Sequence, residues 1–408
     1  MTEAPISSLI PLPSTDVLRA RFVGRPINEL PTPSILLDKA KLQYNCEQML
    51  QTVEQWDCMF RAHVKTLKTA ESTTAQVGQS REKAIIVSTL AEAWGAVQSG
   101  LVKQGIVKDI YSDLKVLIDH PNQVKALQAA LETDLGKFPP MNVFIKIDCG
   151  YVRAGLSVDS PVLPILVQTL AQSSQLCIFG VYTHAGFSYD SKNSNEANSY
   201  LSTEMQSLDR AAQLVKQVSS SIPSAKIRTP LVLSVGSTPT AHAAGTSGQS
   251  GAAVAMKSKL TGGELELHAG NYPALDLQQV ATNAIPNAQI PGIERCALSV
   301  LATITASYPS RDEAMLDGGG IAFAKDLGPI PGYGHVVWPK AYIGWQLGRV
   351  AQEHGVMTLR PVLGDKVQII PQHACMTAAA HPWYFVFDSS TSEQVPTVVD
   401  IWVPWKGW

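Results

Sequence analysis

The sequence predicts a (β/α)8 barrel followed by a C-terminal all-β domain. Between residues 58 and 268, eight short apolar or β-branched runs occur, and most are followed by a segment with a helical pattern. Strands that alternate with helices over this length are what such a barrel requires. After Gly292 the short runs continue, but Gly and Pro separate them and helical patterns are scarce, which is typical of an all-β domain. An open doubly wound sheet is disfavoured because no Gly-x-Gly-x-x-Gly turn follows a first strand.

The expected elements divide the chain into three parts. Residues 1–38 form a Pro-rich lead-in and a strand (34–38) that joins the β domain, residues 39–290 form the barrel beginning with a helix (39–56), and residues 291–408 form the β domain. The barrel strands are expected at 58–65, 84–89, 105–111, 115–119, 142–148, 177–184, 230–235 and 264–268, with helices at 90–99, 121–132, 161–173 and 195–219. The later strands are expected at 296–307, 314–317, 334–338, 355–359, 366–370, 383–387 and 397–404, and the Gly-, Ala- and Ser-rich segment 242–263 is expected to be a loop or a weak helix.

The overall composition is that of a well-packed enzyme. Of the 408 residues, 45% are hydrophobic and 16% charged, and the net charge of −2 comes without long runs of either sign, so we expect neither a nucleic-acid nor a membrane partner. The six cysteines are far apart, which indicates reduced thiols rather than a disulfide scaffold. With neither a signal-peptide pattern nor an apolar stretch of ~20 residues, a cytoplasmic location is expected.

Polar or small residues follow several expected barrel strands, at the end of the barrel where such enzymes keep their active sites. They are Lys65 after the first strand, Arg153 after the fifth, His184 at the end of the sixth, Gly236, Ser237 and Thr238 after the seventh, and Gly270, Asn271 and Tyr272 after the eighth. Small residues there let backbone N–H groups approach an anion. An amine, an anion site and an imidazole on one face indicate pyridoxal 5′-phosphate (PLP), which needs a lysine, a phosphate site and a planar partner for its ring. Each motif alone has an ordinary structural explanation, and it is their common location that favours the cofactor.

The β domain contributes one further motif, His373-Ala374-Cys375. On a strand, the first and third side chains point to the same face, so an imidazole and a thiolate could bind one metal ion. This donor pair favours Zn²⁺ over Mg²⁺ or Mn²⁺. Two protein ligands leave positions open for water or substrate, as a catalytic metal requires.

Taken together, the motifs resemble those of the eukaryotic zinc-dependent D-serine dehydratases and the related D-threonine aldolases, which share the alanine-racemase type of fold. The match runs over 31–33, 61–66, 148–153, 180–186, 236–239, 266–272, 353–355 and 373–375. The resemblance implies that Lys65 binds PLP covalently, that His184 stacks on or beside its ring, and that Arg153 and Tyr189 lie near the ring or the substrate. The phosphate is expected on Gly236, Ser237, Thr238, Gly270 and Asn271.

The same resemblance makes His373 and Cys375 the zinc ligands. The aldolases usually carry an aspartate at the second position and use a harder ion, so the cysteine favours a dehydratase. The resemblance also implies a homodimer in which the β domain of one subunit approaches the barrel of the other. Two departures concern the cofactor: Ala62 and Leu67 stand where the family often has Pro and His, and His268 stands where many racemases have an arginine that faces the pyridine nitrogen.

The expected activity is β-elimination on a small D-hydroxy amino acid, converting D-serine to pyruvate and ammonia. Lys65 is the expected base, and the zinc ion is expected to bind the β-hydroxyl. One alternative is retro-aldol cleavage of a D-3-hydroxy amino acid such as D-threonine, which gives glycine and an aldehyde. A second alternative is a non-catalytic PLP-binding protein, which needs Lys65 but not the metal pair.

Overall fold

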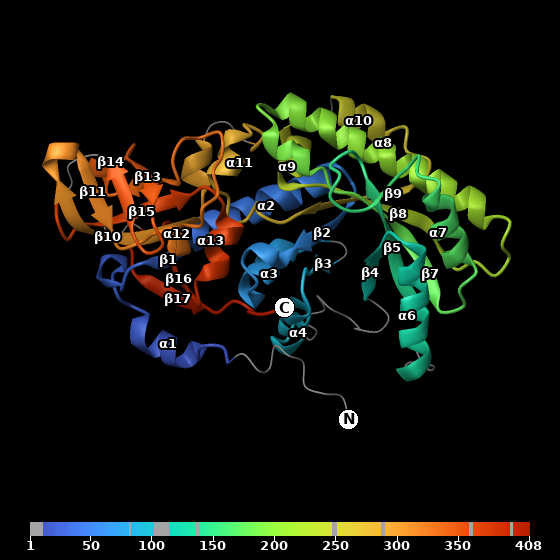
Figure 1. The fold of residues 1–408 in the computed structure, drawn as a ribbon, viewed down its shortest axis with the longest axis horizontal. Helices are drawn as coiled ribbons and strands as arrows, with labels where there is room; N and C mark the ends of the chain where they lie inside the picture. The colour runs from blue at the N-terminus through green and yellow to red at the C-terminus, as the bar shows by residue number, and fades with distance from the viewer. Residues whose placement is uncertain are drawn as a thin grey trace.

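The computed structural model describes residues 11–80, 83–101, 114–134, 139–246, 251–286, 290–358, 362–391 and 395–408. Its two parts lie side by side in Figure 1, with the strands of the β domain on the left and the barrel on the right. This arrangement confirms the predicted α/β barrel followed by an all-β domain. Among the described residues, no helix is both long and apolar enough to cross a membrane.

The barrel strands are parallel to their neighbours and follow the order β3-β2-β9-β8-β7-β5-β4. They are β2 (Met59–His63), β3 (Ile85–Ile86), β4 (Lys115–Ile118), β5 (Met141–Asp148), β7 (Leu176–Tyr182), β8 (Ile227–Val235) and β9 (Gly263–Ala269), and the short β6 (Leu156–Ser157) pairs with β5. The connecting helices are α3 (Ala70–Val77), α4 (Leu90–Gln98), α6 (Pro121–Asp134), α7 (Val162–Ala171), α8 (Ser194–Ser219), α9 (Thr238–Thr246), α10 (Ala252–Lys257) and α11 (Leu277–Ala281). The strand expected at 105–111 lies outside the described residues. The segment 242–263, expected to be a loop or a weak helix, contains α10 and the end of α9.

Helix α8 shows how the sequence determines these elements. Asn193 caps it by accepting a hydrogen bond from Glu196 N at 2.9 Å, and Glu196 Oε2 accepts in turn from Lys192 N. Leu201, Met205 and Leu208 recur at helical spacing and are fully buried. The apolar face therefore packs on the barrel strands while the cap satisfies the first free N–H groups.

The β domain is built on a nine-stranded sheet in the order β11-β14-β13-β12-β15-β10-β1-β16-β17. Its strands are β1 (Ser34–Asp38), β10 (Leu298–Tyr308), β11 (Glu313–Leu316), β12 (Gly334–Trp338), β13 (Gln346–Val350), β14 (Gly355–Thr358), β15 (Lys366–Pro371), β16 (Tyr384–Phe387) and β17 (Val398–Trp402), and helix α1 (Thr15–Phe22) packs on β17. The sequence analysis missed β13, because Gly348 and Arg349 interrupt its apolar pattern. β1 lies between β10 and β16, so the N-terminal strand is part of this sheet.

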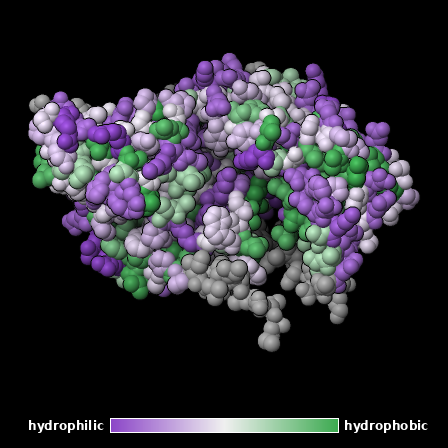
Figure 2. Space-filling view, in the orientation of Figure 1, coloured by the Kyte–Doolittle hydropathy of each residue, from purple (hydrophilic) through white to green (hydrophobic). Residues whose placement is uncertain are grey.

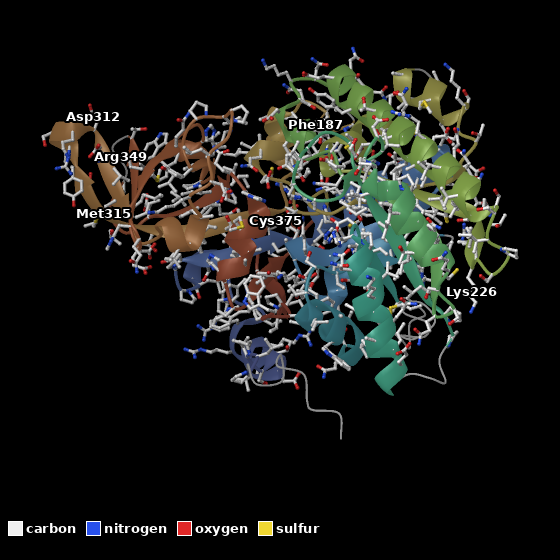
Figure 3. The ribbon with its side chains drawn as sticks, turned by 45° about the vertical axis from the view of Figure 1, so that its right-hand side comes forward. Phe187, Lys226, Asp312, Met315, Arg349 and Cys375 are labelled. Atoms are coloured by element: carbon white, nitrogen blue, oxygen red, sulfur yellow. The ribbon has the colours of Figure 1, made fainter. Side chains whose placement is uncertain are left out.

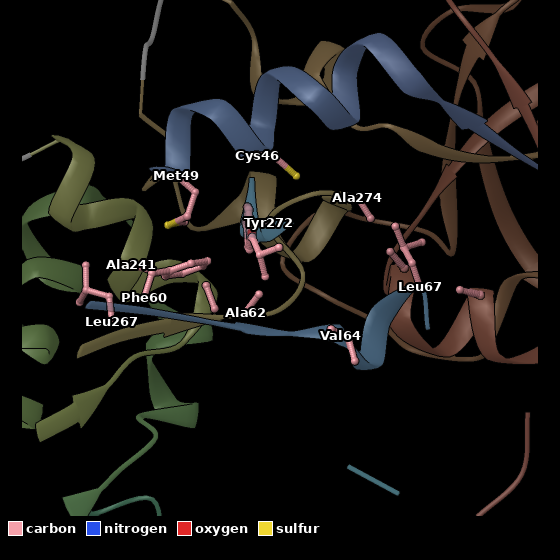
Figure 4. Packing of buried hydrophobic residues seen from close by; sticks show 14 of the residues in the cluster. Cys46, Met49, Phe60, Ala62, Val64, Leu67, Ala241, Leu267, Tyr272 and Ala274 are labelled. Atoms are coloured by element: carbon pink, nitrogen blue, oxygen red, sulfur yellow. The ribbon is translucent and has the colours of Figure 1, made fainter. Parts of the chain in front are cut away.

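Helix α2 (Lys39–Gln55) joins the two parts (Figure 1). It follows β1 directly, and the Asp38 carboxylate caps it by accepting from Ala40 N. Cys46 and Met49 on its buried face pack in the same cluster as Phe60 of β2 and Tyr272 (Figure 4). In the space-filling view, apolar side chains gather around a hollow near the centre of the visible face (Figure 2).

A buried ion pair inside the barrel gives a stability test. Arg61 on β2 donates from Nε and Nη2 to the two carboxylate oxygens of Glu266 on β9, both at 2.9 Å, and the side chains are 12% and 2% exposed. Arg61→Met leaves the Glu266 charge buried without this partner, so we expect the free energy of unfolding to fall by about 3–5 kcal/mol in urea denaturation. Arg210→Met breaks a pair with Asp159 whose side chains are 54% and 71% exposed, and should change stability little. Equal effects of the two substitutions would contradict this account.

Candidate active site

Lys65 lies in the short 3₁₀ turn η3 (Val64–Thr66) that follows β2. Val64 and Leu67, on either side, are buried in the main core (Figure 4). Because these neighbours fix the turn, the half-buried Lys65 is held at the strand end. Ala62 and Leu67, the two positions where the sequence departs from the pattern it resembles, are core residues here with exposures of 0% and 2%.

His184 follows β7 and is joined to the loop after β8. Its Nδ1 lies 2.9 Å from the carbonyl oxygen of Gly236, so Nδ1 carries the proton and donates. Gly236 has φ +144°, and a Cβ there would lie 2.1 Å from the His268 carbonyl oxygen. Only glycine fits this close approach between the loop after β8 and strand β9.

Helix α9 begins at Thr238, two residues after Gly236. Ser237 Oγ accepts from Thr240 N at 3.3 Å and caps the helix, and it also lies 2.6 Å from Ser188 Oγ. Asn271 N donates to Thr238 Oγ1 at 3.0 Å, which brings the loop after β9 beside the helix N-terminus. A glycine turn that leads into a helix N-terminus is a ready anion site, so these residues fit the phosphate of PLP.

Buried polar atoms without a protein partner gather around these loops. In the described part of the chain they include His63 Nδ1, Glu204 Oε2, His268 Nε2 and Asn271 Oδ1. Such atoms are uncommon in folded proteins and call for an explanation. A polar cofactor that binds among these atoms would give them hydrogen-bond partners. The residues present therefore fit PLP.

Three imidazoles near Lys65 are held neutral by their surroundings. Burial lowers the pKa of His184 to about 3, and the charges of Arg153 and Lys65 act in the same direction. Burial, followed by the charge of Lys65, lowers the pKa of His63 well below its ordinary value, and burial does the same for His268. These rings can accept or relay a hydrogen bond but do not add positive charge to the site.

Two predicted residues, Tyr272 and Arg153, have side chains in contrasting surroundings. Tyr272 is fully buried, its ring packs edge-on against Phe60 at 5.9 Å, and its hydroxyl donates to Gln76 O at 3.5 Å. The Tyr272 side chain therefore packs in the core, and a contact of this residue with the cofactor stays a prediction. Arg153 is exposed, with its guanidinium 5.3 Å from the centre of the Tyr151 ring.

Tyr189 lies between the proposed phosphate site and the metal pair. It belongs to the turn η4 (Gly186–Asp190) after β7. Burial, and then the nearby charge of Cys375, raise the pKa of its phenol, while a hydrogen bond with Thr238 lowers it. Its neighbours therefore come from both domains.

The metal pair is not on a strand, which corrects the prediction. Strand β15 ends at Pro371, His373 is the cap residue of helix α13 (Ala374–Ala380), and Cys375 lies in its first turn. The alanine-rich sequence after His373 favours a helix, and Asp276 stabilises its start by accepting from Ala374 N at 2.8 Å. The two residues are still neighbours at the start of α13, since only Ala374 separates them.

Cys375 of the predicted metal pair lies at the domain boundary (Figure 3). Thr66 Oγ1, next to Lys65, is 3.1 Å from Cys375 Sγ and 3.2 Å from Gly270 O. Among the described residues no group of three or more His, Cys, Asp or Glu side chains converges on one point. One nitrogen and one sulfur donor suit a borderline-soft ion with open positions, so the pair fits zinc.

A polar layer inside the barrel was missed by the sequence analysis. Lys146, Tyr182, Ser234 and Glu266 lie beside one another on β5, β7, β8 and β9. Lys146 Nζ lies 4.3 Å from the centre of the Tyr182 ring, which stacks on His268 at 4.2 Å. Burial lowers the pKa of Lys146 to about 8. Lys146, a lysine within the apolar run of β5, was the sequence feature that could have indicated this layer.

Glu204 on α8 was also missed, and it gives a pH test. Its Oε1 accepts from Ala185 N at 2.8 Å and Gly236 N at 3.3 Å, and burial raises its pKa to about 7. The folded protein therefore keeps a proton that an unfolded glutamate releases near pH 4.5, and stability falls as the pH rises from 4.5 to 7. In the wild type, the free energy of unfolding should fall by on the order of 3 kcal/mol over this pH range, and in Glu204→Gln this fall should be absent. Urea unfolding at a series of pH values measures the difference.

Glu264, whose side chain is 53% exposed, provides the control for this test. Glu264→Gln should keep the wild-type pH profile. A Glu204→Gln profile parallel to that of the wild type would show that Glu204 does not hold the proton.

Comparisons with known proteins agree with this geometry. The family described as "Alanine racemase, N-terminal domain" matches residues 37–251, and the family described as "Putative serine dehydratase domain" matches residues 297–387. The D-serine dehydratase of Schizosaccharomyces pombe is 35% identical, with 96% of this chain and 95% of the relative covered. The D-serine dehydratase of Saccharomyces cerevisiae is 32% identical, with 97% and 100% covered.

A solved structure shows the same arrangement over nearly the whole chain. It is a cysteine-to-alanine mutant of D-threo-3-hydroxyaspartate dehydratase in the metal-free form, 27% identical, with a TM-score of 0.76 and coverage of 94% of this chain and 100% of the other. The family matches in both domains and the two fungal relatives indicate the same family. The chain therefore belongs to the D-serine dehydratase-like family with the alanine-racemase fold.

Proposed function

We propose that this protein is a PLP- and zinc-dependent D-serine ammonia-lyase, which converts D-serine to pyruvate and ammonia by β-elimination. The observation that carries the proposal is the 3.1 Å contact between Thr66 Oγ1 and Cys375 Sγ. This contact brings the turn that carries Lys65 next to the helix start that carries His373 and Cys375. β-Elimination needs one group that removes the α-proton and another that helps the β-hydroxyl to leave, and the two domains supply one each.

The barrel supplies the proposed cofactor site. Lys65 is the residue that we assign to bind PLP, and His184 the residue that we assign to its ring. Gly236, Ser237, Thr238, Gly270 and the Asn271 backbone lie where the phosphate is expected. PLP supplies an electron sink for the negative charge that develops at the substrate Cα.

Lys65 is the proposed base. Its Nζ takes the α-proton of D-serine, a role that typically contributes about 10²–10⁴-fold to the rate. Because the rings of His63 and His184 are neutral, they do not bind the substrate carboxylate, and the exposed Arg153 is the cation that we assign to it. Tyr189, whose phenol is buried and whose pKa is raised further by the nearby Cys375, is the residue that we assign to the substrate hydroxyl.

The β domain supplies the proposed metal site. His373 and Cys375 would hold Zn²⁺, which supplies a Lewis acid for the departing β-hydroxyl. The metal-free form of a cysteine mutant in the solved relative supports a cysteine in the metal site. The thiol, in place of the carboxylate expected of an aldolase, favours elimination over retro-aldol cleavage of D-threonine.

Product identification tests the proposal. With D-serine, we expect pyruvate and ammonia, and with D-threonine a 2-oxo acid rather than glycine and an aldehyde. A chelator should stop both reactions, and zinc should restore them. Lys65→Ala should lose the absorbance band of the bound cofactor and lower turnover by at least about 10²-fold.

The matched pair of cysteine variants isolates the metal role. Cys375→Ala should lose zinc and pyruvate formation, whereas Cys177→Ala, at a similarly half-buried cysteine in β7, should retain both. Aldehyde as the main product would support the aldolase alternative. Bound cofactor without turnover of any D-hydroxy amino acid would support the non-catalytic alternative.

A further inference from the structure

We infer that Asp326 is a positioning residue for the metal site, whose carboxylate orients the His373 ring so that Nε2 faces the metal. Asp326 lies in the loop after α12 (Gly320–Phe323), 47 residues before His373. No motif of the sequence marked it. The inference rests on the proposed function, because it requires His373 to be a metal ligand.

The hydrogen bond between the two side chains fixes the tautomer of the imidazole. His373 Nδ1 lies 3.0 Å from Asp326 Oδ1, and since a carboxylate accepts, Nδ1 carries the proton. The lone pair is then on Nε2, the nitrogen that remains available to a metal ion. Histidines that bind metals typically donate their other N–H to a carboxylate or carbonyl, which orients the ring and raises its basicity.

The loop that carries Asp326 is attached to the segment that carries the metal pair. Gln372 Nε2 donates to the carbonyl oxygens of Ile330 and Gly332 at 2.7 and 2.6 Å. At the other end of the loop, Thr377 Oγ1 donates to Phe323 O at 2.9 Å. These bonds hold the loop on both sides of Asp326, so its position relative to His373 is set by the fold.

The hydrogen-bonded pair of His373 and Asp326 is partly exposed to water. This exposure limits how much the loss of Asp326 can weaken zinc binding. The side chains of His373 and Asp326 are 28% and 31% exposed, and a surface pocket lined by Lys325, Asp326 and Met376 lies beside them. Water can replace part of a lost hydrogen bond there. Loss of the carboxylate should therefore weaken zinc binding without abolishing it.

Zinc affinity of the full-length protein tests the inference, measured by competition with a chromophoric chelator. Asp326→Ala should raise the zinc dissociation constant about 10–100-fold. Asp326→Asn should raise it less, because the amide oxygen still accepts from Nδ1–H but carries no charge. Lys325→Ala, which changes the neighbouring exposed side chain, should retain the wild-type constant.

Two further readouts separate positioning from other roles. The melting temperature of the metal-free protein should be the same for Asp326→Ala and the wild type, and the Co²⁺-substituted Asp326→Asn protein should keep the wild-type absorption bands. Unchanged zinc affinity, a melting temperature that falls with the affinity, or altered Co²⁺ bands in Asp326→Asn would each overturn the inference. If His373→Ala binds zinc as tightly as the wild type, the proposed metal site itself is wrong. If His373→Ala loses zinc but the Asp326 variants bind it as tightly as the wild type, the metal site stands and the role of Asp326 is wrong.

Discussion

The contact between the turn after β2 and helix α13 determines where every proposed group lies. Leu67 packs in the same buried cluster as Ala374 and Ala378, and Trp405 N donates to Lys68 O at 2.8 Å. Between these contacts, Thr66 touches Cys375. Because core packing has few alternative arrangements, the amine and the metal pair keep a fixed relation, and a two-group reaction depends on such positioning.

The burial of side chains around this contact also determines which groups of the site are charged. His63, His184 and His268 are kept neutral, and the Glu204 carboxyl holds the His184 and Gly236 loops together through two backbone N–H groups. The positive charge near Lys65 therefore comes from Arg153 and Lys146 rather than from imidazoles. An anionic cofactor and a substrate carboxylate suit such a site.

The fold was predictable from the sequence because strand and helix periods are local. Most barrel strands were placed to within a few residues, whereas β13 was missed where polar residues break the pattern. The proposed metal pair was recognised by its spacing, but the strand assigned to it was wrong, since two residues with one between them can also lie at a helix start. Asp326, Glu204 and Lys146 act through partners distant in sequence, and only the folded chain brings those partners together.

Proton exchange in Cys375→Ala tests most directly the claim that the two domains perform separate halves of one reaction. In zinc-free D₂O with PLP, the variant keeps Lys65 but lacks the metal thiolate. Nuclear magnetic resonance should show the α-hydrogen of D-serine exchanging with solvent while no pyruvate forms. Pyruvate at the wild-type rate, or the absence of any α-exchange, would contradict this division of roles.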